Sequence, residues 1–384
     1  MTKPDIFDPA TYRAVRRPPL QAEPLPAWCY TSAEFLRREA DEVFAKSWVC
    51  IGRGDLIPRP GDYRAIELVG KQLVMLRDRA GKVRVLSNVC RHRGAVLLEG
   101  KGNRAVISCP FHAWGYALDG SLRAAPDMED TQNFDKADYG LKNYEVGEAG
   151  GFVFVRLVPG GPSLQDTMGD LEGVLRPWKP ETLVTARERQ FVAPCNWKLF
   201  LEVFMEDYHL KAVHKSSIYG TYTKPEHQTH FNGDFATIWN PHAGTSALLP
   251  SQQDRALPPI EGNDQAGTRY LWFYPSFAFA ATLDCLWYFE VYPDGPSRTR
   301  VTIGMCFPPE SVAQPGFEAK LDAYDARWKM AMDEDLVVLE RQQRGLESGQ
   351  YTPGRLSHLE PCVGLFANWL VRHAIEQPAA GASA

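Results

Sequence analysis

The chain has 384 residues, of which 44% are hydrophobic and 23% are charged, and its formal net charge is −5 at pH 7. This length predicts two or three domains, and this composition excludes a wholly disordered chain. The negative net charge argues against nucleic-acid binding, which usually depends on a basic surface.

Residues 1–45 contain scattered prolines and one predicted helix, for which Ser32 is the candidate N-cap. Residues 46–158 have a different texture. Short stretches of alternating apolar and polar residues, at 61–68, 71–78 and 82–89, are separated by Gly and Asp turns. These stretches, with a last strand at 150–157, predict a small antiparallel β domain.

Residues 159–384 mix helices and strands. Helices are predicted over 163–175, from Asn196 onward and over 314–344, and strands are predicted over 268–306. The aromatic-rich stretch inside this strand region is broken by Pro275 and Asp284, so we expect no membrane span. The pattern of elements therefore predicts an α+β fold.

The sequence contains eight cysteines, which are too sparse for a disulfide scaffold. The N-terminal residues MTKPDIFDPA have neither a basic stretch nor an apolar one, so we expect no secretory signal. A reduced, cytoplasmic compartment is the expectation. In such a compartment, clustered cysteines bind metals more often than they form disulfides.

One candidate metal site combines two cysteines with two histidines. Cys90 and His92 are followed, after sixteen residues, by Cys109 and His112. Two thiolates and two imidazoles could bind one tetrahedral zinc ion, or they could hold a [2Fe–2S] cluster with cysteines on one iron and histidines on the other. The flanking residues favour iron–sulfur, because they supply tight loops and aromatic cover; they are Gly94, Pro110, Trp114, Gly115 and Tyr116.

A second candidate site lies in the later helices. His209 and His214 are five residues apart, which places them about 140° apart on a straight helix. We therefore predict that the helix is interrupted or widened between them. Two histidines and one carboxylate form the facial triad of non-haem Fe(II) sites, and residues 332–340 contain the best candidate carboxylates.

These motifs resemble those of a known family. CRHRG at 90–94 and CPFHAWGY at 109–116 are similar to the two cluster-binding loops of Rieske proteins. Ala95 and Phe111 occupy the positions where respiratory Rieske proteins have two further cysteines, so the resemblance is to the oxygenase type. NWK at 196–198 and EDYH at 206–209 are similar to the mononuclear iron motif of Rieske non-haem iron oxygenase large (alpha) subunits.

The resemblance covers about residues 28–369 and implies an architecture. An N-terminal segment, 1–45, would pack on a catalytic domain, 159–384, of the helix-grip (START-like) type, with an antiparallel sheet and a long C-terminal helix. A small antiparallel β Rieske domain would occupy residues 46–158.

The resemblance also implies a role for each site residue. The [2Fe–2S] cluster would be held by Cys90, His92, Cys109 and His112. The mononuclear Fe(II) would be held by His209, His214 and Asp335, with Asp333 as the fallback for the carboxylate. Glu206 would bridge His209 to the Rieske His112 of a neighbouring subunit, with Asp207 ranked second for this role.

The implied activity is that of a monooxygenase or dioxygenase that uses O₂ and electrons from NAD(P)H. No G-x-G-x-x-G motif precedes a helix, so a separate flavin and iron–sulfur reductase, or a ferredoxin, would deliver the electrons. Many relatives have Asp where this chain has Glu206. In having Glu at this position, the chain resembles the family members that act on quaternary amines such as glycine betaine, choline, stachydrine and carnitine. The resemblance also implies a homotrimer.

The resemblance implies a small organic substrate, and oxidative N-demethylation with formaldehyde release is the first hypothesis. Phe200, Phe204 and Tyr208 recur every four residues, so we expect them to share one face near the iron ligands, where aromatic rings could enclose a quaternary ammonium. Hydroxylation of an aromatic ring or aromatic acid is the alternative reaction. A non-catalytic electron-transfer iron–sulfur protein is the alternative of another class.

Overall fold

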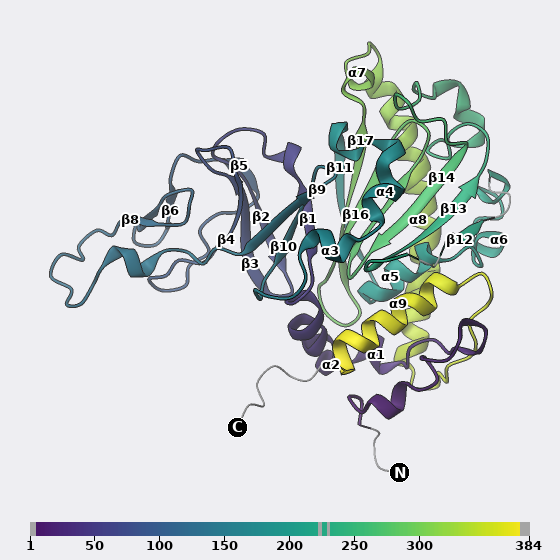
Figure 1. Cartoon of the computed structure of the whole chain (residues 1–384), viewed down its shortest axis with the longest axis horizontal. Coiled ribbons are helices and arrows are strands. Elements are labelled where there is room, and N and C mark those ends of the chain that lie inside the picture. The colour runs from purple at the N-terminus through teal and green to yellow at the C-terminus, as the bar shows by residue number, and fades with distance from the viewer. Residues whose placement is uncertain (1–4, 222–224, 229–230, 377–384) are drawn as a thin grey trace. The chain divides into compact units, whose positions relative to one another are not determined.

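The computed structural model describes residues 5–221, 225–228 and 231–376 (Figure 1). The chain divides into two compact units, of which one is Trp48–Gly161 and the other joins Met1–Ser47 to Pro162–Ala384. Each unit contains antiparallel sheets, which agrees with the predicted α+β class. Within the described ranges, no helix has the length and apolar character needed to cross a membrane.

The unit Trp48–Gly161 is built from three small antiparallel sheets, ordered β1-β10-β9, β4-β3-β2-β5 and β6-β7-β8. All four strands predicted for this region are present, as β2, β3, β4 and β10. The strands are β1 (Val49–Arg53), β2 (Asp62–Leu68), β3 (Lys71–Arg77), β4 (Val83–Ser87), β5 (Lys101–Asn103), β6 (Ile107–Ser108), β7 (Gly115–Tyr116), β8 (Leu122–Ala124), β9 (Glu145–Ala149) and β10 (Phe152–Arg156), with the short helices η4 (Gly54–Leu56) and η5 (Lys136–Tyr139).

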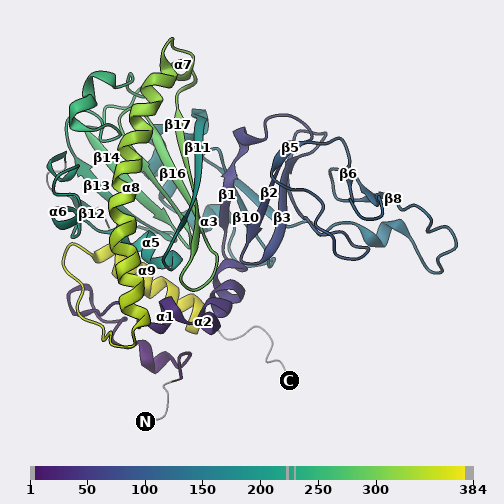
Figure 2. The same ribbon diagram turned by 180° about the vertical axis from the view of Figure 1, so that it is seen from behind.

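The other unit is organised by a seven-stranded antiparallel sheet, ordered β11-β17-β16-β15-β14-β13-β12. The long helix α8 (Phe317–Glu347) lies across one face of this sheet, as Figure 2 shows. Four of these strands fill the region predicted from 268 to 306. The strands are β11 (Val184–Ala193), β12 (Glu226–Gln228), β13 (Phe235–Pro241), β14 (Gly267–Phe273), β15 (Phe277–Ala281), β16 (Leu286–Pro293) and β17 (Thr299–Phe307).

Shorter helices complete this unit, and one of them differs from the prediction. The helix predicted over 163–175 is divided at Gly169, whose φ is +52° and where a Cβ atom would lie 2.1 Å from the Asn232 carbonyl oxygen. The helices are η1 (Pro9–Tyr12), η2 (Pro19–Gln21), α3 (Leu164–Met168), α4 (Leu171–Leu175), η6 (Arg176–Trp178), η7 (Pro180–Thr182), η9 (Tyr219–Thr221), η10 (Pro250–Arg255), α7 (Pro309–Val312), α9 (Pro361–Val371) and η11 (Arg372–Glu376).

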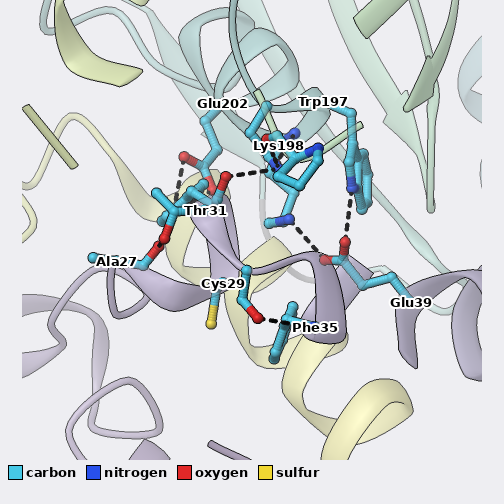
Figure 3. Close-up of polar contacts among 12 residues, drawn as sticks. Ala27, Cys29, Thr31, Phe35, Glu39, Trp197, Lys198 and Glu202 are labelled. Atoms are coloured by element: carbon cyan, nitrogen blue, oxygen red, sulfur yellow. Dashed lines mark hydrogen bonds and ion pairs between the residues drawn. The ribbon is translucent and has the colours of Figure 1, made fainter. Parts of the chain in front are cut away.

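The N-terminal segment is anchored to the helix α5 (Trp197–Glu202) by a buried ion pair (Figure 3). It contains α1 (Trp28–Thr31), α2 (Ala33–Arg38), capped by Ser32 as predicted, and the π-helix η3 (Glu39–Phe44). Lys198 Nζ lies 2.7 Å from Glu39 Oε1, and Trp197 Nε1 donates to Glu39 Oε2 at 3.0 Å. Both charged side chains are fully buried. This contact fixes the start of the segment that leads to His209.

Replacing Lys198 with methionine is expected to lower the free energy of unfolding by about 3–5 kcal/mol, because it leaves the Glu39 carboxylate buried without its partner. Urea unfolding followed by circular dichroism would measure the change. Lys329→Met is the matched control, because Lys329 pairs with Asp333 on the exposed surface of α8 and such pairs contribute at most about 1 kcal/mol. Equal losses in the two variants would contradict the prediction.

Candidate metal centres and substrate cavity

The chain leaves helical geometry at Glu206, just before the first histidine of the second motif. After α5 it forms one 3₁₀ turn, η8 (Val203–Met205), and Glu206 is extended with φ −153° and ψ 161°. Glu206 Oε2 accepts hydrogen bonds from the amides of Tyr208 and His209, the latter at 3.0 Å. These bonds replace the helical ones and hold the break in place.

The predicted interruption is therefore present, but its predicted position between the two histidines is wrong. A single helical turn, α6 (Leu210–Val213), separates His209 from His214, and each histidine flanks that turn. The same break overturns the expectation that Phe200, Phe204 and Tyr208 share one face. Tyr208 is 61% exposed, whereas the rings of Phe200 and Phe204 lie 5.5 Å apart.

Three predicted iron ligands converge at this point of the fold. His209 and His214 flank α6, and Asp335 comes from α8. Asp335 Oδ1 lies 3.0 Å from His214 Nε2 and 3.7 Å from His209 Nε2, and one ligand atom from each residue lies within 4.8 Å of the others. Asp335 Oδ1 is buried and has no hydrogen-bond partner in the described structure. This donor set fits a two-histidine, one-carboxylate ferrous site.

The three acidic side chains at 333–335 point in different directions, because successive residues of a helix are rotated by about 100°. Asp333 pairs with Lys329 at the surface, so Asp335 and not Asp333 reaches the histidines. Glu334 Oε2 lies 2.6 Å from His214 Nδ1 and accepts a hydrogen bond from Ser217. The sequence motifs did not single out Glu334 or Ser217, although Glu334 adjoins a predicted ligand.

Each of the two histidines is oriented by a carboxylate on its Nδ1 side. Glu206 Oε1 lies 2.7 Å from His209 Nδ1, and Glu334 does the same for His214. Outer partners of this kind fix the ring orientation of metal-binding histidines. Both Nε2 atoms consequently face Asp335.

The four residues of the first motif lie on two loops of the unit Trp48–Gly161. Cys90 and His92 follow β4, and Cys109 and His112 lie between β6 and β7. The rings of His92 and His112 lie 4.7 Å apart, and the Trp114 indole stacks on His92. Both cysteines are buried in the apolar core of this unit, whereas His112 is exposed.

The residues on these loops fit a two-iron cluster. His92 Nδ1 is buried and has no hydrogen-bond partner in the described structure. Burial opposes ionisation of Cys109, but amide hydrogen bonds from Phe111 and His112 outweigh it and lower the pKa of the thiol. Among the described residues, the donor atoms on these two loops do not form a group of three within 4.8 Å of one another, whereas those of His209, His214 and Asp335 do. A single tetrahedral zinc ion would need such close donors here.

A cavity opens directly onto the three converging residues, and aromatic side chains form much of its wall. Asp207 also lines it; its carboxylate accepts a 3.3 Å hydrogen bond from Asn240 and lies 3.1 Å from His227 Nε2. The Glu206 carboxylate lies 2.7 Å from His209 Nδ1 instead, and its bridge to another subunit stays a prediction. The aromatic residues of the wall are Phe204, Tyr270, Trp287, Phe289 and Trp328.

A second cavity reaches Glu206 and His209 and is lined by the buried acid Glu202. Glu202 accepts a hydrogen bond from the Tyr30 hydroxyl at 2.9 Å. Burial raises the pKa of Glu202 to about 8, although the hydrogen bond from Tyr30 and the charge of Lys198 oppose the shift. This shift favours the protonated carboxylic acid at neutral pH.

Replacing Glu202 with glutamine is expected to remove a pH-dependent loss of stability. A carboxyl whose pKa is raised on folding stabilises the protein below its unfolded pKa and loses this contribution as the pH rises to about 8. Between about pH 4.5 and 8, the free energy of unfolding of the wild type should fall, relative to that of Glu202→Gln, by up to roughly 1.4 kcal/mol per pH unit. Urea titrations across this range test it, with Glu340→Gln on the exposed side of α8 as the control. Parallel pH profiles for wild type and Glu202→Gln would contradict it.

Comparisons with known proteins identify two domain families in the chain. The family model "Ring hydroxylating alpha subunit (catalytic domain)" matches residues 180–376, and the model "Rieske [2Fe-2S] domain" matches residues 47–144. The carnitine monooxygenase oxygenase subunit of Escherichia coli K12 is 34% identical over 214 residues, so the match spans 55% of this chain and 56% of that relative. The glycine betaine monooxygenase oxygenase subunit of Chromohalobacter salexigens is 29% identical, over 87% of this chain and 81% of the relative.

Solved structures show the same fold. The quaternary ammonium Rieske monooxygenase CntA, in complex with its substrate gamma-butyrobetaine, superposes with a TM-score of 0.79 at 25% identity, over 94% of this chain and 98% of that one. Naphthalene 1,2-dioxygenase from Rhodococcus, at 20% identity and a TM-score of 0.76, shares the fold. Since the catalytic-domain model matches just over half of the chain and the Rieske model matches a separate part of it, the chain belongs to the Rieske oxygenase alpha subunits, which contain a [2Fe–2S] cluster and a mononuclear iron.

Proposed function

We propose that this chain is the oxygenase component of a system that oxidises an N-methyl group of a small quaternary ammonium compound, with O₂ as oxidant and electrons from a separate NAD(P)H reductase. The observation that carries the proposal is the aromatic-walled cavity that opens onto His209, His214 and Asp335. The carnitine and glycine betaine monooxygenase relatives support the same substrate class.

In this proposal the ligands divide between two domains. Residues 46–158 hold the [2Fe–2S] cluster through Cys90, His92, Cys109 and His112. Residues 159–384 hold the iron through His209, His214 and Asp335, and residues 1–45 pack on this domain. Ferrous iron at such a site supplies O₂ activation.

The cavity wall suits a cation that has no hydrogen to donate. Each aromatic ring that faces a quaternary ammonium can contribute about 0.5–2 kcal/mol through the cation–π attraction. The carboxylate of Asp207, held by Asn240 and His227, adds negative charge to the same wall. Together the rings and this carboxylate would hold the ammonium so that one methyl group faces the iron ligands.

The overall reaction balances with the cofactors of the family. One N-methyl carbon, O₂, two electrons and two protons give an N-hydroxymethyl group and water. The N-hydroxymethyl ammonium then breaks its carbon–nitrogen bond, and the products are the tertiary amine, formaldehyde and one proton. The protein must therefore take up protons as well as electrons.

The proposal includes an assembly and a partner. A homotrimer would place the exposed His112 of one subunit against Glu206 of another, and inter-subunit electron transfer is described for a structurally similar quaternary ammonium Rieske monooxygenase. A flavin and iron–sulfur reductase, or a ferredoxin, would reduce the cluster. We also propose a cytoplasmic location, since none of the eight cysteines, all of which lie in the described residues, forms a disulfide.

Oxygen uptake with a surrogate reductase tests the proposal. The panel comprises gamma-butyrobetaine, carnitine, glycine betaine and choline, against benzoate and salicylate, with formaldehyde measured alongside. We expect uptake and formaldehyde with at least one quaternary amine. Uptake with aromatic acids alone would favour ring hydroxylation, and release of trimethylamine in place of formaldehyde would place the oxygen on the methylene carbon. Two irons per chain and no uptake would favour an electron carrier.

A further inference from the structure

A positively charged side chain lies in the wall of the iron-site cavity, at a distance from the iron ligands. Arg327 and Asp335 are both on α8 and both line the cavity. Asp335 is eight positions after Arg327, which corresponds to a helical rise of about 12 Å. Trp328, Ala331 and Met332, on the intervening turns, line the same cavity, so the wall is continuous from one charged residue to the other.

The Arg327 side chain is buried and positioned against an aromatic ring. It is 4% exposed, and its guanidinium carbon lies 5.1 Å from the centre of the Trp287 ring, which is also part of the cavity wall. An arginine retains its charge even when it is buried. Burial lowers the pKa of His242 nearby, and the positive charge of Arg327 lowers it further, which disfavours a second cation beside Arg327.

The opposite end of the cavity is acidic. Glu206, Asp207 and Asp335 line it beside the two histidines. The cavity thus has carboxylates where the substrate would react and a guanidinium about two helical turns away. A ligand with a positive and a negative group, separated by a few atoms, matches this charge distribution.

We propose that Arg327 binds the carboxylate of a zwitterionic substrate while its quaternary ammonium faces the iron ligands. The planar guanidinium can pair with a carboxylate through two parallel hydrogen bonds, which gives orientation as well as affinity. Arg327 is thereby a specificity residue that selects N-methylated amino acids over uncharged or purely cationic amines. This inference rests on the proposed function and adds the second recognition element of the substrate.

The test compares gamma-butyrobetaine with its amide, which has the same length and lacks the negative charge. In the wild type, kcat/KM for gamma-butyrobetaine should exceed that for the amide by on the order of 100-fold. Arg327→Met should lower kcat/KM for gamma-butyrobetaine by a similar factor, mainly through KM, and should change the amide by less than about threefold. Arg327→Lys should recover part of the preference. Arg341→Met, on the exposed side of α8, is the matched control and should change neither substrate.

The outcomes separate this inference from the proposed function. Consumption of both compounds at equal efficiency by the wild type, or an equal loss for both in Arg327→Met, would overturn the role of Arg327 while the oxidation of quaternary amines stands. Consumption of no quaternary amine in the substrate panel would overturn the proposed function itself. Iron content and the visible spectrum of the cluster establish that each variant is folded, and Arg327→Lys serves for the comparison if Arg327→Met fails this check.

Discussion

Replacing Asp335 with alanine is expected to abolish substrate-dependent O₂ uptake and to lower the iron content from about three to about two per chain, with the visible spectrum of the [2Fe–2S] cluster retained. The reason is geometric. Asp335 Oδ1 is the oxygen that both histidine Nε2 atoms face, so its loss leaves two ligands where three converge. Oxygen-electrode assays, iron determination and visible absorption spectroscopy measure the three quantities.

Asp333→Ala is the matched control for this prediction. It removes the same chemical group two residues away on the same helix, but Asp333 pairs with Lys329 at the surface. We expect full iron content and near wild-type uptake in the control. An Asp335→Ala protein that keeps three irons per chain would show that another group completes the iron site.

Replacing Glu206 with glutamine is expected to slow electron delivery by about 100-fold in protein reconstituted with excess iron. Glu206 holds His209 Nδ1 at 2.7 Å and, in the proposed assembly, joins it to His112 of another subunit. In single-turnover experiments, pre-reduced protein is mixed with O₂ and substrate, and reoxidation of the cluster is followed by its absorbance. We expect slow reoxidation in the variant and fast reoxidation in the wild type.

Glu334→Gln separates electron delivery from support of the iron. Glu334 holds His214 Nδ1 as Glu206 holds His209, but nothing in the proposed electron route passes through it. Removing this outer partner should weaken iron binding by about 10–100-fold and leave cluster reoxidation fast in protein reconstituted with excess iron. Reoxidation of Glu206→Gln at the wild-type rate would contradict the bridging role.

Those helices and strands could be predicted whose residue pattern lies within the element itself. Alternation of apolar and polar residues located β2, β3, β4 and β10, and apolar spacing of three and four located α8 to within three residues at each end. The strand β11 was not predicted. Its sequence, VTARERQFVA, is highly charged and half-exposed, and it is a strand because it pairs with β17 more than a hundred residues later. Long-range pairing leaves little trace in the sequence of one partner.

Sequence alone determined the residue types of the two metal sites, because ligand chemistry requires Cys and His at short spacings on a loop, and two His within a few residues of each other. Only the tertiary structure showed that Asp335, and not Asp333, lies beside the two histidines, because both precede Glu340 on the same helix and the packing of α8 on the sheet determines which of them is buried. It also decided where the helix breaks, since the Glu206 carboxylate satisfies two backbone amides that a continuous helix would bond differently. The placement of Arg327 and the aromatic rings around one cavity arises from helix-on-sheet packing, which brings together residues far apart in the chain.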